Sequence, residues 1–126
     1  LADFDKALTL DPQDADDWLS RGLVKEKLKD LPGAINDITQ AINIKSDFEK
    51  AWLCRGNVLV KLNRVNEAIE DYGLAVFHYP EYGAAYYNRA LALHKMGKLK
   101  EACRDLLEAQ RLSVKIERKV FETICK

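Results

Sequence analysis

The sequence feature that most constrains the fold is a repeat with a period of 34 residues. Trp18 and Trp52 are the only two tryptophans and lie 34 positions apart, and one further step reaches the aromatic Tyr86. Other residues recur at the same step, namely Gly22, Gly56 and Ala90, the alanines Ala34, Ala68 and Ala102, and the aspartates Asp3, Asp37, Asp71 and Asp105. A fixed period of this length predicts that one small structural unit is stacked along the chain.

Each unit is predicted to contain two helices. Apolar and small residues follow helical spacing within a unit, as in the series Ala34, Ile35, Ile38, Ala41 and Ile42. Such a series defines one buried helix face. The small residues Gly22 and Gly56 should let the two helices of a unit approach closely, Gly22 near Ala34 and Gly56 near Ala68. Short polar breaks and the prolines at 12 and 80 mark helix ends, because proline disfavours helical geometry in the residue before it. We expect helices over residues 1–10, 15–28, 32–44, 49–62, 66–78, 83–96, 100–112 and 116–125.

This pattern resembles the tetratricopeptide repeat (TPR) family, and the resemblance covers nearly the whole chain. It implies an all-α fold, a right-handed α-solenoid of helix–turn–helix units with a C-terminal capping helix. The implied single TPR domain spans 1–126, with the second helix of a truncated repeat at 1–14, full repeats at 15–48, 49–82 and 83–116, and the capping helix at 117–126.

The two ends of the chain carry separate expectations. Because the sequence begins inside a second helix, we expect it to be a fragment of a longer repeat protein. The C-terminal end is similar to the last repeat and capping helix of bacterial TPR proteins. Its apolar residues should cover the last repeat and its polar residues should face outward, namely Ile116, Val120, Phe121 and Ile124 against Glu117, Arg118, Lys119 and Glu122.

Composition and motifs exclude several functional classes. The 20 lysines and arginines balance the 20 aspartates and glutamates, so the chain lacks the positive field on which nucleic-acid binding depends. No apolar run approaches the roughly 18 residues that span a bilayer. The sequence contains no motif for nucleophilic catalysis, phosphate binding or metal ligation. We expect a protein that is not an enzyme, needs no cofactor or metal, does not bind nucleic acid and does not insert into a membrane.

The three cysteines, Cys54, Cys103 and Cys125, lie far apart and form no C-x-x-C pair. This spacing fits neither a disulfide framework nor a structural zinc site. Reduced, partly buried thiols are the favoured expectation. A bridge between Cys103 and Cys125 is the alternative if the protein is exported.

Function is expected to come from a surface, because stacked helix pairs form a curved array with a concave groove lined by the first helix of each unit. Helical geometry gives this groove a row of apolar residues and a row of lysines. An exposed apolar row with polar neighbours is typical of a binding site. The candidate peptide-binding residues are Leu19, Leu23, Lys27, Leu53, Asn57, Lys61, Tyr87, Asn88, Leu91 and Lys95. Alternatively, other parts of the array cover the leucines, and the lysines are merely solvated.

Asn57 and Asn88 are the most informative of these candidates. In TPR co-chaperones that clamp a C-terminal carboxylate, asparagines at these two places hold the peptide backbone. The clamp's lysine would fall at Leu53 and its final basic pair at Arg118 and Glu122, so recognition of a chaperone's acidic C-terminus is not expected. Capture of an extended, partly apolar peptide through amide hydrogen bonds is favoured.

The predicted function is therefore a non-catalytic protein–protein interaction module that binds a segment of another protein or peptide in its concave groove. The alternative is a structural role, either as a spacer in a larger repeat protein or in self-association through the exposed first helix at 1–14.

Two charged rows also recur in register, aspartates on second helices and arginines on first helices. They allow two sets of ion pairs. The favoured set joins each Asp to the Arg of the next unit, as Asp3–Arg21, Asp37–Arg55 and Asp71–Arg89, and leaves Asp105 facing Thr123. The alternative set joins each Arg to the Asp of its own unit, as Arg21–Asp37, Arg55–Asp71 and Arg89–Asp105.

Overall fold

The computed structural model describes residues 2–125 and contains eight helices and no strand in that range, which confirms the all-α prediction. The helices are α1 (Ala2–Leu10), α2 (Ala15–Lys27), α3 (Leu31–Ile44), α4 (Glu49–Lys61), α5 (Val65–His78), α6 (Gly83–Lys95), α7 (Leu99–Arg111) and α8 (Arg118–Ile124). Their ends lie within two residues of the predicted ones. Leu1 and Lys126, which the predicted terminal units include, lie outside the described residues. None of these helices has the length and apolar character that crossing a membrane requires.

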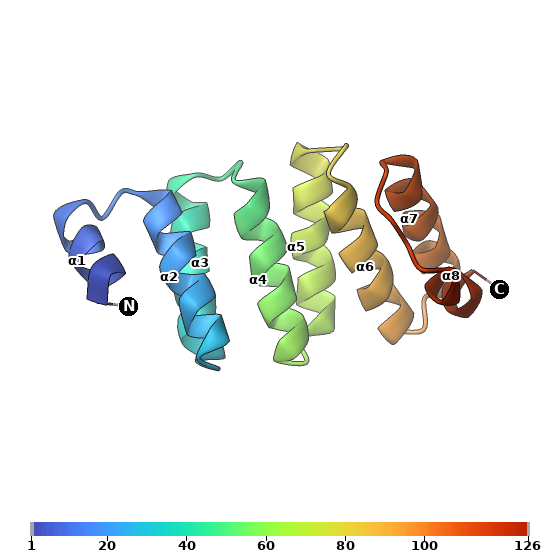
Figure 1. Ribbon diagram of the computed structural model, residues 1–126, viewed down its shortest axis with the longest axis horizontal. Coiled ribbons are helices and arrows are strands. Elements are labelled where there is room, and N and C mark those ends of the chain that lie inside the picture. Colours follow the sequence, from blue (N-terminus) through green and yellow to red (C-terminus); the bar gives the residue numbers. More distant parts are fainter. Residues whose placement is uncertain (1, 126) are drawn as a thin grey trace.

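The helices form a solenoid in which each one packs against the next in the chain. Figure 1 shows them standing side by side, with α1 and α8 at opposite ends. The first helices of successive pairs also touch, because α2 contacts α4 and α4 contacts α6. These three helices therefore form one face of the solenoid.

The turn inside each helix pair has the same backbone conformation. Lys29, Asn63 and Gly97, which are 34 residues apart in sequence, all have a positive φ, of 67°, 60° and 77°. The left-handed region suits Gly, is tolerated by Asn and is unfavourable for Lys. Each pair must reverse direction here, because the second helix begins two residues later. The repeated period therefore fixes the turn as well as the helices.

Small residues allow the two helices of a pair to approach closely. A Cβ added to Gly22 would lie 2.8 Å from Ile38 Cγ1 and 3.3 Å from the Ala34 carbonyl oxygen, which confirms the expected contact near Ala34. At Gly56, the nearest atoms belong to the Tyr72 ring, 2.5 Å from the added Cβ, whereas the sequence predicts Ala68 there. A side chain at either glycine would force the helices apart.

The arginine and aspartate rows pair within each helix pair, so the favoured prediction of pairing between units is wrong. Arg21, Arg55 and Arg89 each donate two hydrogen bonds, from Nε and Nη2, to the carboxylate 16 residues later, at 2.6–2.9 Å. The carboxylates are those of Asp37, Asp71 and Asp105, all buried. Asp105 consequently faces Arg89 and not Thr123, whose hydroxyl donates to the Lys119 carbonyl.

The physical reason for this pairing is the antiparallel packing of the two helices, which brings residues 16 apart side by side. An aromatic ring three residues earlier on the same helix supports each guanidinium. The Arg21, Arg55 and Arg89 Cζ atoms lie 5.0, 4.9 and 5.6 Å from the ring centroids of Trp18, Trp52 and Tyr86. Cation–π contact holds the charge against the second helix of its own unit.

The unit boundary is bridged by the remaining guanidinium nitrogen, Nη1. Arg21 Nη1 reaches Asp5 Oδ1 at 2.7 Å, and Arg55 Nη1 donates to Thr39 Oγ1 at 3.3 Å. The equivalent position on α5 is Gly73, and only Arg89 Nη1 lies within 4 Å of a Cβ added there. The partner of Nη1 across the unit boundary is therefore a carboxylate at Asp5, a hydroxyl at Thr39 and no side chain at Gly73. The bridge between units weakens in this order along the chain.

The C-terminal segment folds back over the last helix pair. Ile116, Val120, Phe121 and Ile124 pack on a core that contains Ala90, Leu93, Ala102 and Leu106, while Glu117, Arg118, Lys119 and Glu122 are exposed, as expected.

This packing places Cys125 against Cys103, with 4.9 Å between their Cα atoms, and the two form a disulfide. The expectation that these two thiols are reduced is therefore wrong. Although the two cysteines are 22 residues apart in sequence, the return of α8 over α7 brings them together in space. Cys54 is a free, buried thiol, as expected, and burial raises its pKa to about 11.

Candidate peptide-binding groove

A pocket of about 550 Å³ opens on the face formed by α2, α4 and α6. Five of the predicted groove residues line it, Asn57 and Lys61 from α4 and Asn88, Leu91 and Lys95 from α6. The other lining residues are Glu26 from α2, Val60 from α4, Tyr72 from α5, and Ala92 and His94 from α6. The structure therefore brings half of the candidate set to one place.

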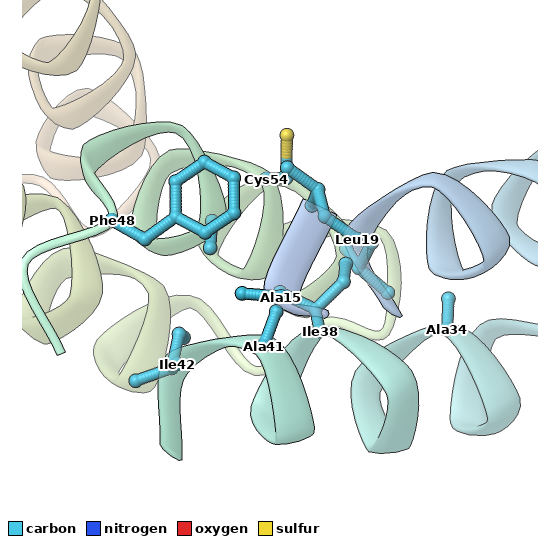
Figure 2. Close-up of a cluster of buried hydrophobic side chains, with 10 residues drawn as sticks. Ala15, Leu19, Ala34, Ile38, Ala41, Ile42, Phe48 and Cys54 are labelled. Carbon is cyan, nitrogen blue, oxygen red and sulfur yellow. The ribbon is translucent and has the colours of Figure 1, made fainter. Parts of the chain in front are cut away.

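The other five candidates lie outside this pocket. Leu19 is 4% exposed and packs with Ala15 and Ile38 in the cluster of Figure 2, so the prediction that it is an exposed anchor is wrong. Its position one helical turn after Ala15 turns it toward α3. Lys27 is exposed.

Leu23, Leu53 and Tyr87 are half-buried. Leu23 packs against the same cluster as Leu19, Leu53 against the cluster around Leu59, and Tyr87 against the cluster around Ala90. Each of them therefore packs partly against the core, although helical spacing predicts an exposed place in the groove.

Asn57 and Asn88 form a joined pair in the pocket. Asn57 Oδ1 accepts a hydrogen bond from the Tyr72 hydroxyl at 2.5 Å and another from Asn88 Nδ2 at 3.2 Å. Both acceptor positions of this oxygen are thus occupied. Among the hydrogen bonds of residues 2–125, none uses Asn57 Nδ2 or Asn88 Oδ1. The pair therefore offers one free donor group and one free acceptor, the groups that a peptide backbone requires.

Tyr72 is one of the lining residues that the sequence did not indicate. It is 2% exposed, yet it lines the pocket. Burial, and to a smaller extent the nearby Asp71 carboxylate, raise the pKa of its phenol above the usual value, so the hydroxyl stays a neutral donor. The sequence signal is a substitution at a core position, since the equivalent residues of the neighbouring units are Ile38 and Leu106.

Charges surround the asparagine pair asymmetrically. Lys61 Nζ forms a 2.7 Å ion pair with Glu26 Oε2, whose side chain is only 15% exposed, and so connects α4 to α2. Lys95 is exposed and forms no ion pair within residues 2–125. Leu91, Val60 and Ala92 supply the apolar surface between these groups. The pocket therefore suits a backbone segment with an apolar side chain.

Two sequence models match the C-terminal half of the chain. A model of the TPR repeat matches residues 56–97, and a model of the tetratricopeptide repeat matches residues 83–113. Together with the helix pairs and the 34-residue period, they assign the matched residues to the TPR repeat family. The chain contains TPR repeats. Such repeats are generally protein-interaction units and are generally non-enzymatic.

Two solved structures share the fold of this chain. The crystal structure of MamA superimposes with a TM-score of 0.84 at 23% identity, covering 87% of this chain and 64% of MamA. The chain therefore spans less than two thirds of that protein. The first TPR of Spaghetti (RPAP3) bound to the HSP90 peptide SRMEEVD gives a TM-score of 0.82 at 24% identity, with 90% of each chain covered. No curated protein sequence matches the chain significantly.

Within residues 2–125, no group of three or more His, Cys, Asp or Glu side chains is placed to hold a metal ion.

Proposed function

We propose that this TPR chain is a non-catalytic module that binds an extended segment of another protein along the face formed by α2, α4 and α6. The observation that carries the proposal is the Asn57–Asn88 pair, which leaves a free donor and a free acceptor in an open pocket. A bound peptide would accept a hydrogen bond from Asn57 Nδ2 and donate one to Asn88 Oδ1. The zero net charge favours a protein partner over a nucleic acid.

Three further features support this proposal. The apolar surface of Leu91, Val60 and Ala92 lies beside the asparagines and suits one aliphatic side chain of the peptide. The ion pair between Lys61 and Glu26 holds α4 at a fixed distance from α2, which keeps the pocket preformed. The Spaghetti TPR, which has the same fold, carries a bound peptide.

The remaining candidates extend the proposed contact surface beyond the pocket. Leu23, Lys27, Leu53 and Tyr87 would meet the parts of the partner that run along α2, α4 and α6. Leu19 is left out of the proposed surface because it is buried.

The test selects binding peptides from a phage-displayed random library on the immobilised full chain and measures their affinity by calorimetry. Asn88→Ala and Asn57→Ala should each weaken binding by roughly 5- to 100-fold, because a buried polar group of the peptide loses its partner. Asn36→Ala is the matched control, since Asn36 is exposed on α3. Peptides that bind the asparagine variants as tightly as the wild type would overturn the proposal.

The structural alternative makes a different prediction. A spacer, or a chain that self-associates through α1, should select no peptide on the α2–α4–α6 face. Sedimentation-velocity measurements over a dilution series distinguish the two roles, because self-association gives a mass that depends on concentration and a peptide-binding monomer does not.

A further inference from the structure

We infer that the Tyr72 hydroxyl fixes the direction of the Asn57–Asn88 hydrogen bond, and thereby the direction in which a peptide backbone lies in the groove. Tyr72 would act as a positioning residue that reaches the peptide only through Asn57. The inference rests on the proposed peptide-binding function and adds a polarity to it.

A pair of asparagines has no preferred direction by itself. Rotating both carboxamides by 180° exchanges their oxygen and nitrogen atoms with little change in shape. In one arrangement Asn88 donates to Asn57, and in the other Asn57 donates to Asn88. The two arrangements present opposite free groups to the groove, so they suit peptide backbones that run in opposite directions.

Tyr72 makes these arrangements unequal. Its hydroxyl donates to Asn57 Oδ1 at 2.5 Å, and this is the only hydrogen bond of the hydroxyl among the described residues. In the rotated arrangement the Asn57 nitrogen would face the hydroxyl, which would then accept a hydrogen bond but find no acceptor for its own proton. A buried donor without an acceptor is costly. Because Tyr72 is 2% exposed, this cost is not removed by bulk water.

The selected arrangement gives each helix a fixed role. Asn57 Nδ2 on α4 is the donor toward the groove, and Asn88 Oδ1 on α6 is the acceptor. A peptide must therefore present a carbonyl over α4 and an N–H over α6. Ile38 and Leu106, which occupy the equivalent core positions, carry no hydroxyl, so this selection belongs to the central unit.

The ligand-free test is nuclear Overhauser spectroscopy of the intact chain with Tyr72→Phe, which keeps the ring that fills the space at Gly56. In the wild type, the Asn57 side-chain NH₂ protons should point away from the ring of residue 72. In Tyr72→Phe, the two arrangements should become comparably populated, and cross-peaks between these protons and the substituted ring should appear. An unchanged cross-peak pattern would overturn the inference.

The second test uses a peptide selected from the random library, carrying a nitroxide at its N-terminus or at its C-terminus. In the wild type, each label should broaden backbone signals mainly at one side of the groove. In Tyr72→Phe, each label should broaden signals at both sides, as the preference of roughly 3- to 10-fold that one hydrogen bond provides is lost. Tyr79→Phe is the control, because the Tyr79 hydroxyl donates to the Asp47 carbonyl and does not line this pocket.

The outcomes separate the two hypotheses. A single peptide direction in both wild type and Tyr72→Phe would overturn the role of Tyr72 while leaving peptide binding intact. Failure of the wild type to select any peptide would overturn the proposed function itself, and with it the inference.

Discussion

Asp71→Ala tests the ion pair in the centre of the solenoid. Asp71 is 4% exposed and accepts hydrogen bonds from Arg55 Nε and Nη2 at 2.8 and 2.9 Å. Removing one partner of a buried pair costs about 3–5 kcal/mol. Two features of Arg55 lower this cost. Its side chain is 20% exposed, so water reaches part of it, and its cation–π contact with the Trp52 ring, at 4.9 Å, remains in the variant. We therefore expect a loss of about 2–4 kcal/mol in the free energy of unfolding.

The assay is urea unfolding followed by circular dichroism, combined in two double-mutant cycles. Asp71→Ala and Arg55→Ala should be coupled by about 1–3 kcal/mol, because the two side chains are in direct contact. Asp37→Ala and Arg55→Ala should be additive within about 0.5 kcal/mol, since Asp37 bonds to Arg21 and Lys25 instead. Coupling between Asp37 and Arg55 as strong as that between Asp71 and Arg55 would refute pairing within units.

The matched control is Glu67→Ala on the same helix. Glu67 forms an ion pair with Arg64, and both side chains are about half exposed. Solvent screens such a pair, so the unfolding midpoint should hardly change. A loss as large as that of Asp71→Ala would show that removing any carboxylate from α5 lowers stability, and that the effect is not particular to the buried pair.

Three further perturbations have defined outcomes. Burial opposes ionisation of Asp37, but hydrogen bonds from the neighbouring cations hold its pKa below the usual 3.8. Asp37→Asn should therefore lower the free energy of unfolding at neutral pH. The difference in this free energy between wild type and variant, measured by chemical unfolding, should shrink as the pH falls below 3.8. Gly73→Ala should raise the free energy of unfolding by about 0.5–1 kcal/mol, and Gly73→Asp should add a salt-sensitive attraction to Arg89, which thermal melts at low and high salt would reveal. Cys125→Ser should lower stability by roughly 3 kcal/mol, because the bridge to Cys103 closes a loop between residues 22 apart; equal melting temperatures before and after reduction of the wild type would contradict this.

The periodic sequence was sufficient to predict the helix pairs and their limits. A 34-residue step brings the same residue types to the same places, so each unit repeats the same local preferences. The turn at Lys29, Asn63 and Gly97 repeats with it, even though only Gly97 favours the left-handed backbone. Close packing at Gly22 also followed from the sequence, because a small residue recurs where two helices must approach.

The groove residues were predicted only in part, because helical spacing gives the angle of a side chain but not what packs against it. Asn57, Asn88 and Leu91 reach the pocket from two different helices. Leu19 also lies at the helical spacing that predicts a place in the groove, but the core around Ile38 covers it. Tyr72 escaped notice because its position marked it as a core residue, although it also lines the pocket.

The sequence alone determined that arginines and aspartates recur in register, and it left two pairings open. The tertiary structure decided between them, because antiparallel helices bring residue 21 beside residue 37 and not beside residue 3, and because Trp18 holds the guanidinium there. It likewise decided the disulfide, since only the return of α8 brings Cys125 to Cys103. A sequence period determines which residue types recur at fixed steps along the chain, whereas pairing depends on which helix surfaces meet when the helices pack.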